Sequence, residues 1–122
     1  MLFLLSSERY LQEKKLAAFF EKGYGISLLG QLYKSTIENL EHGTYDIYLN
    51  VSDPKPQYPA FRDFLMRLRR LNLITLDESN EKKTRKLPRL KNEVIELIDS
   101  IEKELFENPL VNRAQNRRNK SP

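Results

Sequence analysis

The 122-residue chain is long enough for one compact domain but not for two, because short chains bury too little surface to support separate cores. It has no cysteine, which excludes disulfides and thiolate metal sites and favours a reducing, cytoplasmic location. Its net charge of +4 is compatible with polyanionic partners.

The N-terminal segment Met1–Leu5 is apolar, but polar residues follow too soon for a signal peptide or a membrane span. We therefore expect a short strand or a docked terminus there, and no membrane partner. Ser7 is a suitable N-cap, and Gly23 a suitable terminator, for a first helix over residues 8–22. Its apolar residues recur at helical spacing: Leu16, Phe19 and Phe20.

A second amphipathic helix is predicted to run to about His42, with a division into two helices at Ser35–Thr36 left open. Its apolar residues are three and four positions apart: Ile26, Leu29, Tyr33, Ile37 and Leu40. In residues 44–51 apolar side chains alternate with mostly polar ones, which predicts a half-buried strand. The two prolines within residues 52–57 then predict a loop.

Pro59 suits the first turn of a third helix, because its missing amide hydrogen costs nothing there. Its predicted buried stripe is Phe61, Phe64, Leu65, Leu68 and Leu71, which leaves the arginines on the other faces. Residues 73–76 and 84–90 read as two strands around a polar turn, and Pro88 marks the second as an edge strand. Asn92 is expected to cap a last helix with a seam suited to a partner helix: Val94, Ile98, Ile101 and Leu105.

Charge is segregated along the chain. Residues 58 to 91 hold ten Arg and Lys against four acids, whereas residues 92 to 107 hold six acids against one Lys. Six bases within residues 82–91 would present a dense positive field to a phosphate backbone. The segment 109–122 adds four bases and little to bury, so we expect a disordered basic tail: Arg113, Arg117, Arg118 and Lys120.

The order of helix, short connection, strand and basic hairpin is that of a winged helix, in which a recognition helix enters the major groove. We therefore expect an α+β, mostly helical fold over residues 1–108: a winged helix-turn-helix with a two-stranded wing and a C-terminal dimerisation helix. The residues expected to contact DNA are Tyr58, Arg62, Arg67 and Arg69 on the helix, and Lys82, Lys83, Arg85, Lys86 and Arg89 on the hairpin.

Three segments of the chain also resemble a known family. Gly23-Tyr24-Gly25-Ile26, Tyr58-Pro59-Ala60-Phe61-Arg62 and Leu68-Arg69-Arg70-Leu71-Asn72-Leu73-Ile74 look like the corresponding segments of the PadR-like winged-helix transcriptional regulators. The resemblance covers roughly residues 10 to 107. It implies a regulator that dimerises through C-terminal helices, with Tyr58, Pro59 and Arg62 at the start of the recognition helix and Lys82, Lys83 and Arg85 on the wing.

From these features we expect a sequence-specific DNA-binding transcriptional regulator, homodimeric and nucleoid-associated in the cytoplasm, without cofactor or metal. An enzyme is not expected, since the single histidine, His42, would have to supply any Ser-His-Asp or metal-histidine site alone. Two alternatives stay open. One is a plasmid or phage protein that organises DNA for partition or replication, and the other is a winged-helix module that binds a protein partner.

Overall fold

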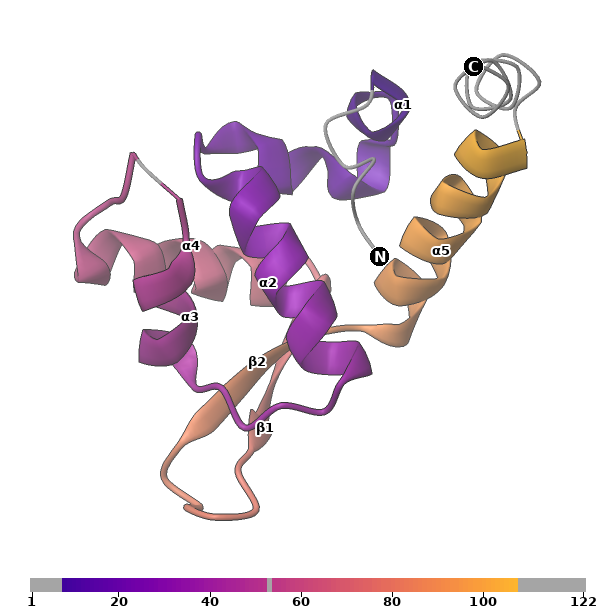
Figure 1. Ribbon diagram of the computed structural model, residues 1–122. Coiled ribbons are helices and arrows are strands. Elements are labelled where there is room, and N and C mark those ends of the chain that lie inside the picture. The colour runs from indigo at the N-terminus through magenta and orange to yellow at the C-terminus, as the bar shows by residue number, and fades with distance from the viewer. Residues whose placement is uncertain (1–7, 53, 108–122) are drawn as a thin grey trace, which may run out of the picture.

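The computed structural model describes residues 8–52 and 54–107. They form an α+β, mostly helical fold with one two-stranded antiparallel sheet, which is compatible with a winged helix (Figure 1). The predictions made for the apolar segment 1–5 and the basic segment 109–122 lie outside the described residues. Every helix in the described part of the chain is too short or too polar to span a bilayer.

The predicted first helix is two short helices, α1 (Glu8–Leu11) and the 3₁₀ helix η1 (Lys14–Glu21). The backbone is extended at Glu13, with φ −85° and ψ 108°, and the chain changes direction there. Tyr10 and Leu16 are six residues apart, which on one straight helix would point them about 120° apart. The break allows both side chains to be fully buried.

Helix α2 (Gly25–Ile37) ends before His42, so the predicted extension to His42 is wrong, and the helix continues without a division through Ser35 and Thr36. The reason is a left-handed residue, Asn39, at φ 51°. The Leu40 amide donates to the Ser35 carbonyl at 3.0 Å, which closes the helix end around Asn39. Asparagine tolerates this backbone conformation better than other residues with a side chain.

Residues 44–50 form a helix, α3 (Thr44–Asn50), where the sequence predicts a strand. The Asp46 carboxylate accepts a hydrogen bond from the Gly43 amide at 2.9 Å and so fixes the first turn. Ile47 and the following Val51 are buried and four residues apart, so they share one helical face. The alternate apolar residues Tyr45 and Leu49 are instead 54% and 52% exposed, which contradicts a half-buried strand.

Helix α4 (Tyr58–Arg70) confirms the predicted third helix, with Pro59 in its first turn. Its predicted stripe is buried except for Leu71, which follows the helix and is 46% exposed. Asn72 takes the left-handed conformation at φ 61°, and the Leu73 amide donates to the Leu68 carbonyl at 3.0 Å. This closed helix end turns the chain directly into the first strand.

Strands β1 (Ile74–Glu78) and β2 (Lys86–Leu90) form the expected hairpin, which projects from the helical body (Figure 1). Pro88 pairs with Leu76, and in a sheet of two strands its missing amide donor can face outward. Side chains alternate between the two faces of this ribbon, so Lys86 and Arg89 lie on opposite faces. Because of this alternation, only basic side chains on the same face of the hairpin can contact the same ligand.

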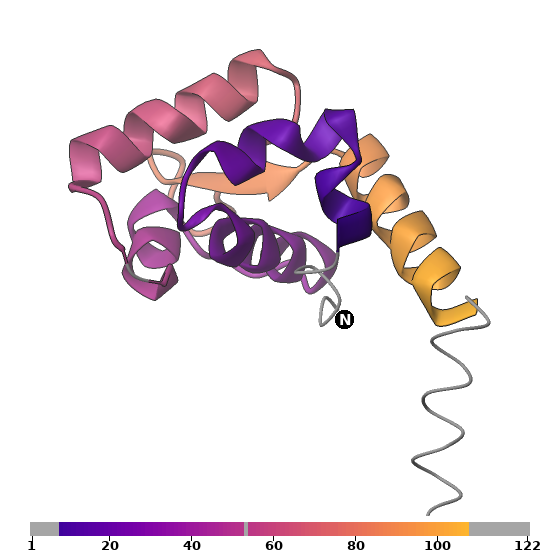
Figure 2. The ribbon, with the colours of Figure 1, turned by 90° about the horizontal axis from the view of Figure 1, so that it is seen from above.

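Helix α5 (Asn92–Glu107) confirms the predicted last helix, although Lys91 occupies the cap position because its carbonyl accepts from Val94. Three of the four residues of the predicted dimer seam pack inside the single chain. Val94 and Ile98 are fully buried and Ile101 is 1% exposed within the single chain. Of the seam, only Leu105 is partly exposed. Figure 2 shows α5 on the opposite side of the molecule from α4.

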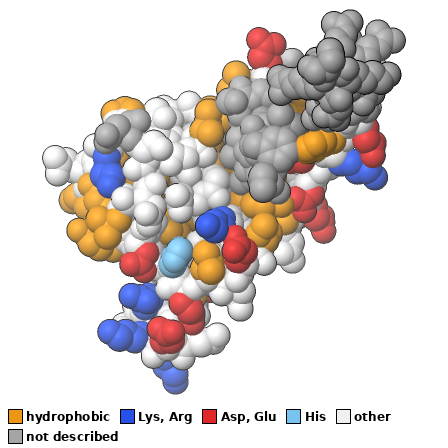
Figure 3. All heavy atoms as spheres, in the orientation of Figure 1, with side chains coloured by type: hydrophobic (Ala, Val, Ile, Leu, Met, Phe, Trp, Pro, Cys, Tyr) orange, Lys and Arg blue, Asp and Glu red, His pale blue; other side chains and the backbone are white. Residues whose placement is uncertain are grey.

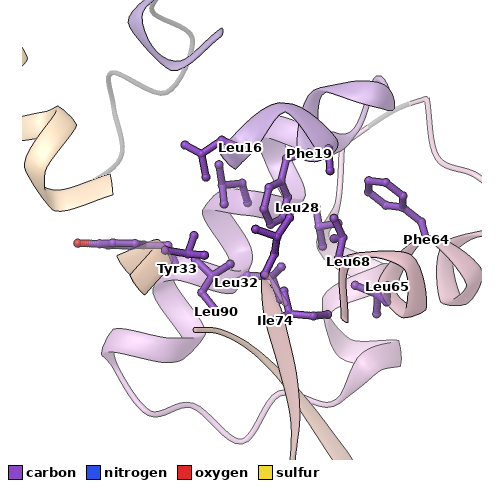
Figure 4. Close-up of a cluster of buried hydrophobic side chains, with 14 of the residues drawn as sticks. Leu16, Phe19, Leu28, Leu32, Tyr33, Phe64, Leu65, Leu68, Ile74 and Leu90 are labelled. Atoms are coloured by element: carbon purple, nitrogen blue, oxygen red, sulfur yellow. The ribbon is translucent and has the colours of Figure 1, made fainter. Parts of the chain in front are cut away.

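One hydrophobic core joins the helices to the base of the hairpin. Figure 4 shows side chains from η1, α2, α4 and both strands converging there. Phe19, Leu28, Leu32 and Leu68 are fully buried in it, and Ile74 is 1% exposed. Because Ile74 and Leu90 pair across the strands and both belong to this core, the hairpin is fixed at its base relative to α4.

Candidate nucleic-acid interface

The outward face of α4 carries three exposed residues together with Tyr58, which is half-buried and packs against the core. Tyr58, Arg62, Met66 and Arg69 follow one another at intervals of four and three, so they share one side of the helix. Arg62 is exposed, and its guanidinium carbon lies 5.9 Å from the centre of the Tyr58 ring. Arg62 and Met66 of this row line a hollow together with Leu76 and Lys86 of the hairpin.

Four of the predicted DNA-binding residues meet at one hollow between α3, α4 and the hairpin, which we call the wing hollow. It has a volume of about 380 Å³, and Tyr58, Arg62, Arg85 and Lys86 all line it. A smaller hollow of about 160 Å³ also has Arg62 and Lys86 in its wall, together with Leu76. Basic side chains from α4 and from β2 are therefore neighbours in space.

The tip of the hairpin carries Lys82 and Lys83, both exposed. The Ser79 hydroxyl accepts hydrogen bonds from the Glu81 and Lys82 amides at 3.1 and 3.2 Å, which fixes the turn. Figure 3 shows Lys and Arg side chains at this tip with acidic side chains among them. One such pair is formed by Lys86 Nζ and Glu78 Oε1, 3.6 Å apart. The positive field at the wing is thus weaker than the number of basic residues in the hairpin alone predicts.

Two arginines of the hairpin fasten it to the connection between α2 and α3. Arg89 donates to the Asn39 side chain and, at 2.6 Å, to the Leu40 carbonyl. It lies on the ribbon face away from Lys86, so the structure does not bring Arg89 to the wing hollow. Arg85 donates to the Glu41 carbonyl at 3.3 Å and lies 3.8 Å from Asp46, while it still lines the hollow.

Arg67 is directed to the other side of α4. Its guanidinium donates to both carboxylate oxygens of Glu21 on η1, at 2.7 and 3.0 Å. These hydrogen bonds raise the pKa of Arg67 and lower the pKa of Glu21. Arg67 therefore holds η1 against α4, and it is not among the residues of the wing hollow. Arg69 remains on the outward face, in the last turn of the helix.

Sequence reasoning missed five residues of the wing hollow: Gly43, Thr44, Tyr45, Asp46 and Thr84. Three of them lie on α3, which the sequence predicts as a strand, so their position next to α4 was not foreseeable. His42 was expected at a helix end, but α2 stops five residues earlier and His42 lies in the connection to α3.

No family model, no curated protein and no solved structure matches this chain.

Proposed function

We propose that the protein binds duplex DNA through α4 and the β1–β2 hairpin, as a winged-helix transcriptional regulator. The observation that carries the proposal is the wing hollow, where Arg62 of α4 lies beside Arg85 and Lys86 of the hairpin. A recognition helix that reads base edges next to a wing that contacts phosphates uses the same two elements. Binding, without a catalytic reaction, is the whole of the proposed activity.

The dimensions of α4 suit the major groove. Its 13 residues span about 20 Å, and the groove is about 12 Å wide, enough to admit an α-helix. Arg62 and Arg69 are seven residues apart on the outward face, so they would meet base pairs at separate positions along the groove. A guanidinium makes paired hydrogen bonds to guanine, which gives Arg62 the role of a base-reading residue.

The hairpin supplies the phosphate contacts in this proposal. Lys82 and Lys83 at its tip are exposed, and none of their side chains forms an ion pair within the described residues. Lysine ammonium groups release counterions from DNA when they bind phosphates, so the wing governs the salt dependence of binding. The acidic helix α5 lies away from α4, so it does not repel DNA at this face (Figure 2).

Homodimerisation through α5 stays a prediction, and its face differs from the expected one. The apolar side of α5 packs inside the chain, and Tyr33 of α2 donates to Asp99 of α5 at 2.5 Å. A dimer through α5 would therefore use its exposed, largely acidic side. The two alternative functions, DNA partition and docking of a protein partner, also stay predictions, since no observation favours either over a regulator.

Selection of bound duplexes from a random library tests the proposal with a matched pair of variants. Arg62→Ala and Arg67→Ala remove the same side chain from the same helix, but only Arg62 faces the wing hollow. We expect the unaltered chain to enrich a defined sequence, Arg62→Ala to lose preference at one or two positions, and Arg67→Ala to keep it. An unaltered chain that enriches no sequence and binds no duplex at low salt would refute the proposal.

A further inference from the structure

Three residues that carry hydroxyl groups line the wing hollow and are absent from the predicted set of DNA-binding residues. Thr44 and Tyr45 from α3 and Thr84 from the hairpin line it next to the three bases Arg62, Arg85 and Lys86. Among the residues that line it, Asp46 is the only acid. Its carboxylate is already engaged by the Gly43 amide and lies 3.8 Å from Arg85. The wall therefore offers an excess of hydrogen-bond donors and positive charge.

Tyr45 is held in a defined position with its hydroxyl unused. Its ring stacks on Tyr48 at 5.9 Å between ring centres and meets Tyr58 edge to face at 5.1 Å. The Tyr48 hydroxyl is occupied, since it donates to the Pro56 carbonyl at 2.7 Å. Within residues 8–52 and 54–107, the Tyr45 hydroxyl has no such partner, and the side chain is 54% exposed. Tyr48 thus supports the ring, and Tyr45 presents a donor.

This combination of groups points to a phosphodiester as the ligand. Phosphate oxygens in protein–DNA complexes accept hydrogen bonds from Arg and Lys and from Ser, Thr and Tyr hydroxyls. Guanidinium and ammonium donors make the stronger, charge-assisted bonds, and hydroxyls complete the remaining acceptor positions. Because Tyr48 and Tyr58 already pack against the Tyr45 ring, the ring is less suited to stacking with a nucleobase than its hydroxyl is to a phosphate.

We propose that the wing hollow seats one backbone phosphate of duplex DNA, bound jointly by Tyr45, Thr84, Arg85 and Lys86. The inference rests on the proposed function and adds α3 as a third element of the interface. Asp46 and the Glu41 carbonyl orient Arg85 toward this phosphate, and Arg62 remains the base-reading residue. The DNA strand then passes between α4 and the hairpin, so the phosphate fixes the register of α4 in the groove.

The salt dependence of binding distinguishes the loss of the Tyr45 hydroxyl from the loss of a wing lysine. A neutral hydroxyl displaces no counterion, so its loss weakens binding without changing the slope of log K against log salt. Tyr45→Phe keeps the ring in the aromatic cluster and removes only the hydroxyl. A hydrogen bond to a charged acceptor predicts binding weaker by about tenfold to 150-fold. Lys86→Ala, in contrast, should lower both the affinity and the slope.

The test is a fluorescence anisotropy titration of the full chain with the selected duplex over a range of salt concentrations. Thr84→Val serves as a second variant, and Thr75→Val is its matched control, because Thr75 lies on the ribbon face away from Lys86. We expect Tyr45→Phe and Thr84→Val to weaken binding at an unchanged slope, and Thr75→Val to bind as the parent does. Thermal unfolding of each variant checks that the fold is retained.

A scan with neutral methylphosphonates then locates the phosphate. At one position, replacing the phosphate should abolish the difference between the parent and Tyr45→Phe, because the two changes remove the same contact. If the parent binds and Tyr45→Phe binds equally well, the inference is wrong and the proposed function stands. A second outcome would also overturn the phosphate assignment. If Tyr45→Phe retains binding, and Tyr45→Leu loses affinity chiefly for single-stranded DNA, the ring stacks on a nucleobase. A parent that binds no duplex refutes both proposals.

Discussion

Replacing Ile98 by Ala tests whether α5 belongs to the core of a single chain. Ile98 is fully buried without any partner chain. The substitution removes three carbon atoms, whose burial contributes about 2 to 2.5 kcal/mol at about 0.8 kcal/mol each. The cavity that remains adds to this cost, so we expect the free energy of unfolding to fall by about 3 to 4 kcal/mol.

Urea denaturation followed by circular dichroism measures this loss, and Ile26→Ala is the matched control. Ile26 lies on α2 and is 40% exposed, so the same truncation there should cost less than about 1 kcal/mol. The unfolding midpoint of Ile98→Ala should fall by the same amount at protein concentrations that differ tenfold. A loss no larger than that of Ile26→Ala would refute the placement of α5 in the core.

Three further predictions concern the framework around the interface. Arg89→Ala removes the hydrogen bonds to Asn39 and Leu40, so we expect a loss of about 1 to 3 kcal/mol in urea denaturation, and an unchanged midpoint would contradict the anchoring role. Burial and the hydrogen bond to Asp99 raise the pKa of Tyr33 to about 12. The stabilisation by the Tyr33 hydroxyl is therefore complete below pH 10 and is lost as the pH rises toward about 12. Tyr33→Phe should remove this part of the pH dependence, and equal alkaline stability curves for the parent and the variant would contradict the prediction. Gly25→Ala places a methyl group 1.4 Å from the Phe19 carbonyl oxygen, so thermal unfolding should begin many degrees lower, and an unshifted transition would show that η1 is placed differently.

The elements with distinctive end signals were predictable from the sequence. Pro59 and the apolar stripe of α4 identified the helix, and the turn residues between the two strands identified the hairpin. The helical conformation of segment 44–51 was not predictable, because Ile47 and Val51 fit both a strand face and a helix face. The Gly43–Asp46 hydrogen bond that decides for the helix is too local a signal to outweigh the alternation.

The candidate site was predictable in part, for a related reason. Charge density marked the hairpin, but the hydrogen-bond acceptors of Arg85 and Arg89 lie more than forty residues away in sequence, in the α2–α3 connection. A local sequence pattern shows that a basic residue is present, but it does not show which acceptor that residue donates to. The apolar row that includes Val94 and Ile98 has the same ambiguity, since a helix that packs on its own core and one that packs on a partner chain share a periodicity.

The salt dependence of DNA binding tests the joint interface of α4 and hairpin most directly. Two triple variants of equal net charge would be compared with the parent by anisotropy: one replaces Lys82, Lys83 and Lys86 by Ala, and the other replaces Lys14, Lys34 and Lys103, which lie on η1, α2 and α5. The account predicts that the hairpin variant lowers the slope of log K against log salt by about 2 to 3, while the control keeps the slope of the parent. Equal slopes for the two variants would contradict it.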